Sequence, residues 1–83
     1  MTIPNDDWIL NYMRTAPDEM RTCPDAAIAF MQENGIRYSE YQRNHLKTVI
    51  NRKMKIMEKY GMVRYTGRIV SSNIRSKIWE VLV

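Results

Sequence analysis

One predicted helix carries the polar side chains of this chain that are best suited to contacting a polyanion. Arg43, Asn44, Lys47, Thr48 and Asn51 share part of its outward surface at helical spacing. Arg and Asn can form paired hydrogen bonds to guanine and adenine respectively, while Lys47 and Thr48 suit phosphate oxygens. The competing interpretation is that these residues form an ordinary polar helix face exposed to solvent.

Four further residues extend this candidate surface. Arg37 and Ser39 stand at the start of the same helix, where free backbone N–H groups also attract phosphate. Arg68 and Arg75 flank a predicted hairpin turn and could reach a minor groove or flanking phosphates. The alternative is that these two arginines only keep an exposed hairpin soluble and guard its edge.

The remaining basic and aromatic neighbours have simpler interpretations. Lys55 and Lys59 lie further along the helix and are interpreted as ordinary solvated charge. Tyr38 and Tyr41 flank the helix start, where aromatic rings could stack on unpaired bases. The favoured interpretation is that both tyrosines pack beneath the helix cap.

Catalysis and metal binding have little support in the sequence. There is no Ser/His/Asp set at a recognisable spacing and no glycine-rich phosphate loop. Cys23 and His45 are the only residues of their types, so four protein ligands for zinc cannot be assembled from them. Cys23 precedes a helix, where a thiolate is favoured and a redox switch is conceivable, but a buried thiol is commoner. We therefore expect no enzyme activity, cofactor, metal or small-molecule ligand.

Charge is divided unevenly along the 83 residues, which suffice for a single domain spanning 1–83. Residues 1–36 hold two basic and six acidic residues, whereas residues 37–83 hold eleven basic and three acidic ones. One face should therefore be positive and should bind a polyanion, nucleic acid before an anionic membrane. The start of the chain lacks signal-peptide features, no apolar run could span a bilayer, and a lone cysteine fits a reducing compartment. These features predict a cytoplasmic location without a membrane partner.

Two helices are predicted before the basic one. Asn5 or Asp6 can cap the first helix, and residues 15–22 read as a loop. Pro24 suits the first position of a second helix. Asn34 and Gly35 should end this helix.

The third helix should be the longest. Ser39 and Gln42 form a capping-box pattern, and nothing interrupts the helix before Gly61, about 21 residues on. Lys53 falls within the apolar stripe, so it must snorkel, pair, or mark an opening in the core. The stripe itself comprises Leu46, Val49, Ile50, Met57 and Tyr60, with Met54 and Ile56 at its margins.

Gly61 should take a left-handed backbone conformation. After it, apolar residues no longer recur at helical spacing but at every second position. Residues 62–66 and 77–83 are predicted strands, and the turn formers between them indicate a hairpin. A short extra strand at residues 36–38 is compatible with the pattern.

The sequence resembles winged helix-turn-helix proteins. Residues 50–63 look like the end of a winged-helix recognition helix, with Met57 and Met62 where leucine is usual. Residues 6–10 and 24–29 are similar to the first two helices of small archaeal and archaeal-virus repressor-like regulators. The second helix exceeds the tight helix-turn-helix pattern, and the third is about two turns longer than usual, so the turn that faces DNA stays open.

The resemblance implies an α+β fold, with three helices followed by a two-stranded antiparallel wing. It implies a sequence-specific regulator of transcription, acting as a repressor, that binds double-stranded DNA in the cytoplasm, at the nucleoid or within a viral host. The third helix would enter the major groove and the wing would touch the flanking backbone. Because so small a domain makes few base contacts, we expect a homodimer, joined through the first helix or residues 79–83.

Two alternatives of other classes stay open. A winged-helix fold can serve as a protein–protein module within a larger assembly, because fold does not fix function. The chain could also bind single-stranded nucleic acid through Tyr38 and Tyr41.

Overall fold

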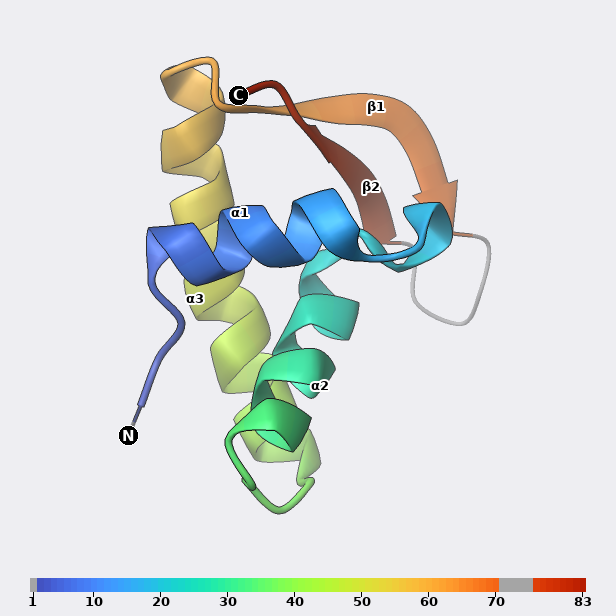
Figure 1. The fold of residues 1–83 in the computed structure, drawn as a ribbon. Helices are drawn as coiled ribbons and strands as arrows, with labels where there is room; N and C mark the ends of the chain where they lie inside the picture. The colour runs from blue at the N-terminus through green and yellow to red at the C-terminus, as the bar shows by residue number, and fades with distance from the viewer. Residues whose placement is uncertain (1, 71–75) are drawn as a thin grey trace.

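The computed structural model describes residues 2–70 and 76–83, which form three α-helices followed by an antiparallel hairpin (Figure 1). This arrangement confirms the predicted α+β class and has the layout of a winged helix-turn-helix domain. None of the helices described is long and apolar enough to span a membrane. The elements are α1 (Asp6–Thr15), the 3₁₀ helix η1 (Asp18–Met20), α2 (Cys23–Glu33), α3 (Glu40–Lys59), β1 (Val63–Val70) and β2 (Ser76–Val81).

The three α-helices begin where the sequence predicts. The side chains of Asn5, Thr22 and Ser39 each accept a hydrogen bond from the backbone N–H three residues on, at 2.8, 3.2 and 3.1 Å. Such a cap stabilises a helix by about 1 kcal/mol. The reciprocal half of the capping box on α3 is not formed, because the Gln42 Oε1 is buried without a hydrogen-bond partner.

The core lies where α1 crosses α2 and α3 and where the hairpin closes over them (Figure 1). Ala26 and Ala27 are fully buried, and their small side chains let α3 pack closely against α2. The core residues are Ile9, Leu10, Met13, Cys23, Ala26, Ala27, Phe30, Met31, Leu46, Ile50, Met54, Met57, Val63 and Trp79.

The apolar stripe of α3 differs from the prediction at its margins. Met54 is fully buried, whereas Tyr60 is 73% exposed, so its assignment to the stripe was wrong. The stripe ends at Met57 because the chain reverses there, with the Met62 N–H donating to the Met57 carbonyl at 2.9 Å. Gly61 makes the reversal with φ +73°, as predicted.

The wing hairpin is longer than predicted. Gly67 adopts φ +85° inside β1, and the pairing register shifts between Tyr65 and Ile69, which marks a bulge rather than a turn. The Thr66 hydroxyl stabilises this bulge by accepting from the Arg68 N–H at 3.2 Å and donating to the Ile78 carbonyl at 2.9 Å. Arg68 lies in β1 shortly before its last residue, Val70, which agrees with its predicted place near the end of the hairpin.

Two other local predictions have different outcomes. The short strand expected at residues 36–38 does not form, because the Ile36 N–H donates to the Met31 carbonyl at 2.8 Å and completes the end of α2. The turn formers at 71–73 and Arg75 lie outside the described residues.

Candidate nucleic-acid interface

A hollow of about 490 Å³ opens between the middle of α3, the start of α2 and strand β2. We call it the basic groove. Four of its lining side chains are cationic, and no Asp or Glu is among those that the structure describes there. The lining residues are Lys47, Thr48, Asn51, Arg52 and Lys55 of α3, Cys23 and Pro24 of α2, and Ser76, Lys77 and Trp79 of β2.

Two contacts join the three walls of the groove. The backbone N–H of Trp79 donates to the carbonyl of Arg21 at 2.9 Å, which fixes β2 beside the residues that lead into α2. The Cys23 thiol lies 4.0 Å from the Asn51 Oδ1 and connects α2 to α3. The groove therefore depends on segments that are far apart in the sequence.

The electrostatic potential of the groove is positive for two reasons. Lys47, Arg52, Lys55 and Lys77 concentrate positive charge, and the N-terminus of α2 adds a partial positive charge from its helix dipole. None of these four cations takes part in an ion pair among the residues described. The ion pairs found there are Lys53–Asp6, Arg64–Glu80 and Arg68–Asp18.

The thiol in the groove wall is buried. Burial raises the pKa of the Cys23 thiol to about 12, and the nearby charges of Lys47 and Lys77 offset only part of that effect. The interpretation that the sequence favoured, a buried thiol rather than a redox switch, is confirmed, because Cys23 is buried.

The structure gathers some of the predicted contact residues of α3 and separates others. Lys47, Thr48 and Asn51 all line the basic groove. Asn44 lies one turn earlier on the same face and is exposed. Arg43 is not among the groove residues, but its Nη2 donates to the Asn44 Oδ1 at 3.4 Å, so these two predicted contact residues lie side by side.

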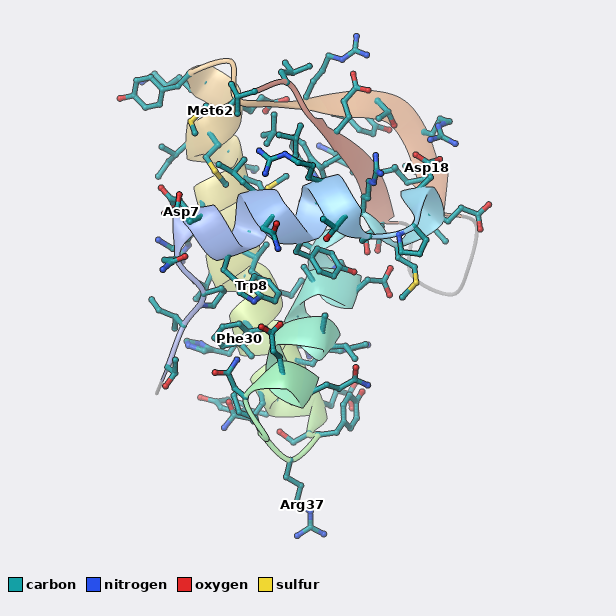
Figure 2. All side chains as sticks on the ribbon, viewed as in Figure 1. Asp7, Trp8, Asp18, Phe30, Arg37 and Met62 are labelled. Carbon is teal, nitrogen blue, oxygen red and sulfur yellow. The ribbon has the colours of Figure 1, made fainter. Side chains whose placement is uncertain are left out.

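The predicted residues outside the α3 face do not reach the groove. Ser39 uses its hydroxyl as the helix cap, and Arg37 extends away from the body of the protein at the loop between α2 and α3 (Figure 2). Arg68 pairs with Asp18 of η1 and lines a separate hollow with Ile78. None of the residues that line this second hollow lines the basic groove.

Three cations of the groove were not among the contact residues predicted from the sequence. Arg52 was not selected, Lys55 was interpreted as solvated charge, and Lys77 lay in a predicted strand. The helical spacing from Lys47 to Lys55 was a usable signal for the first two. Nothing in the sequence indicated that Lys77 would face them.

The two tyrosines at the start of α3 are exposed. Tyr38 is 59% and Tyr41 is 77% accessible, so the expectation that they pack beneath the helix cap was wrong. Ile36 contacts the core from this loop instead, which leaves both tyrosine rings in solvent.

Comparison with protein-family models, with curated proteins and with solved structures finds no match for this chain.

Proposed function

We propose that the protein is a sequence-specific, double-stranded DNA-binding regulator of transcription that acts as a repressor. In this proposal α3 enters the major groove and the β1–β2 wing contacts the flanking backbone. The observation that carries it is the basic groove, in which four cations line the gap between α3 and the wing and the described lining residues include no Asp or Glu.

The position of the groove suits a duplex. When a helix lies in the major groove, a sugar–phosphate strand runs along its side. In this fold that strand would pass between α3 and β2, beside Lys47 and Lys77. These lysines would neutralise phosphates, while Asn51 and Arg52 would face base edges.

The test is binding of a labelled mixed-sequence duplex at several salt concentrations. We expect log K to fall with log[salt] with a slope of about −3 to −6, for about 4 to 7 phosphate contacts. Selection from random duplexes then identifies the site. Absence of binding even at low salt overturns the proposal and favours the protein–protein module.

The homodimer is part of the proposal, because one domain of this size makes few base contacts. The dimer interface that we propose involves fewer residues than the one expected from the sequence. The apolar side of α1 belongs to the core, and Trp79 is buried, so Leu82 and Val83 are the exposed apolar residues that end the chain. We propose that these two residues meet their copies in the dimer.

A second candidate function is favoured by the exposed tyrosines. Tyr38 and Tyr41 present aromatic rings to solvent beside Arg37, an arrangement that suits stacking on unpaired bases. Competition between duplex and single strand for the same protein separates the two functions. Tighter binding of the single strand supports this second candidate.

A further inference from the structure

Thr48 lines the basic groove, and its hydroxyl proton is already used within α3. Its Oγ1 donates a hydrogen bond to the carbonyl of Asn44, one turn earlier on α3, at 2.9 Å. This bond uses the hydroxyl proton within the helix, so it is not offered to a phosphate oxygen. Since the side chain is exposed and lines the groove, its methyl group is left to face an occupant.

Asn51, the next groove residue along this face, is oriented by its neighbour. Its Oδ1 lies 4.0 Å from the Cys23 Sγ, and burial keeps that thiol protonated and able to donate. With the oxygen turned towards Cys23, the amide N–H₂ of Asn51 points away from α2. The groove therefore receives a hydrogen-bond donor from Asn51 beside the methyl group of Thr48.

We infer that Thr48 and Asn51 together read a thymine in the major groove. Among the four bases, thymine alone presents a methyl group next to a carbonyl oxygen on its major-groove edge. Residues three apart on a helix are neighbours, so one base can meet both side chains. The Thr48 methyl packs against the C5-methyl of the base, and the Asn51 N–H₂ donates to O4.

This inference rests on the proposed duplex binding and adds the base that is recognised. The experiment starts from duplexes recovered by selection from a random pool. The selected duplex is made in two forms, with thymine or with uracil at every thymine position, which differ only in the methyl group. Binding of both forms is measured for the wild type, Thr48→Ser and Thr48→Val, and thermal unfolding confirms that each variant is folded.

The wild type should bind the thymine duplex about fourfold more tightly than the uracil duplex, the effect of burying one methyl group. Thr48→Ser keeps the hydroxyl but lacks the methyl, so it should lose the preference. Thr48→Val supplies the methyl without the hydroxyl, so it should restore the preference.

Three results overturn the inference while duplex binding stands. The selected site could lack thymine, the wild type could bind both duplexes equally, or Thr48→Ser could keep the preference. Failure of the wild type to bind any duplex is a different result, because it removes the proposed function and the inference together.

Discussion

Lys53, within the apolar stripe of α3, pairs with Asp6 in the first turn of α1, with its Nζ 3.5 Å from the Asp6 Oδ1. Of the three possibilities that the sequence left open for this lysine, pairing is the one observed. The two side chains are 31% and 59% exposed, so water screens their attraction. Asp6 also lies at the positive end of α1, where a carboxylate is favourable.

We expect this ion pair to contribute little to stability. Lys53→Met should change the free energy of unfolding by less than about 1 kcal/mol, because an apolar side chain suits the stripe. Asp6→Asn should lower it by about 0.5 to 1 kcal/mol through the lost charge at the helix start. Urea unfolding of both single variants and the double variant measures the coupling. A coupling above about 2 kcal/mol would show that the pair is far better shielded than its exposure implies.

Lys55 and Lys59 provide a matched test of the basic groove. Both are exposed lysines on α3, but only Lys55 lines the groove. Lys55→Gln should weaken duplex binding and reduce the magnitude of the salt slope by about 0.9, as expected for one lost phosphate contact. Lys59→Gln should leave the slope near that of the wild type. Equal effects of the two substitutions would mean that general charge, not the groove, holds the DNA.

Tyr41 and Tyr60 test the single-strand alternative. Both are tyrosines about three-quarters exposed at opposite ends of the same helix, but Tyr41 shares its face with Thr48 and Arg52. If the protein stacks unpaired bases, Tyr41→Ala should weaken binding of a single-stranded oligonucleotide by about 1 to 3 kcal/mol. Tyr60→Ala serves as the control in the same fluorescence titration. A Tyr41→Ala variant that binds single strands as the wild type does would argue against stacking there.

The Cys23 thiol should be unreactive over the ordinary pH range. Burial raises its pKa to about 12, so very little of the thiol is ionised at pH 8. Reaction with a disulfide reagent at pH 8 should be at least about a hundredfold slower in the folded protein than in urea.

The same shift has a consequence for stability. The folded state holds the Cys23 proton more tightly than the unfolded state, so this contribution to the free energy of unfolding is complete below pH 9. It should decline as pH rises from about 9 to about 12. Urea unfolding across this range checks the sign, with Cys23→Ala showing a shallower decline. The raised pKa of Tyr12, also about 12 and caused by burial and then by Asp25, leaves a residual decline in that variant.

The proposed homodimer predicts a mass that depends on Leu82 and Val83. Sedimentation velocity of the wild type should show a dimer at micromolar concentration. Leu82→Glu should shift it to a monomer, because a charge at an apolar contact is costly to bury. Thermal unfolding of the variant should stay close to the wild type, since Leu82 is exposed. A wild-type monomer at every concentration, with and without DNA, would exclude the dimer.

The sequence predicted those features of the fold that local chemistry determines. Ser39 and Gly61 mark the ends of α3 through a side-chain cap and a left-handed residue, and neither depends on the rest of the protein. The extent of β1 could not be predicted in this way. Its bulge at Gly67 and its continuation to Val70 depend on the pairing with β2, which no local signal specifies.

The candidate site was predicted in part, because its composition depends on packing. A helical projection places Lys55 and Lys59 on the same polar side, and it cannot show which turn of α3 lies beside β2. Lys77 was missed because strand alternation gives two faces without stating which one meets a helix. Tyr41 was assigned to the cap because an exposed aromatic ring is the less common outcome, yet the loop before α3 extends past the core.

The hydrogen bond between Trp79 and Arg21 joins two main-chain groups, so no side-chain substitution at either position deletes its donor or acceptor, proline at Trp79 excepted. The placement of β2 beside the residues that lead into α2 is therefore held by a main-chain contact. Thr48, Arg52 and Lys77 take part neither in this bond nor in the contact between Cys23 and Asn51, so they can be substituted without removing either one. This separation makes the domain a practical scaffold for engineering altered recognition, because libraries at these positions would vary chemistry at fixed geometry.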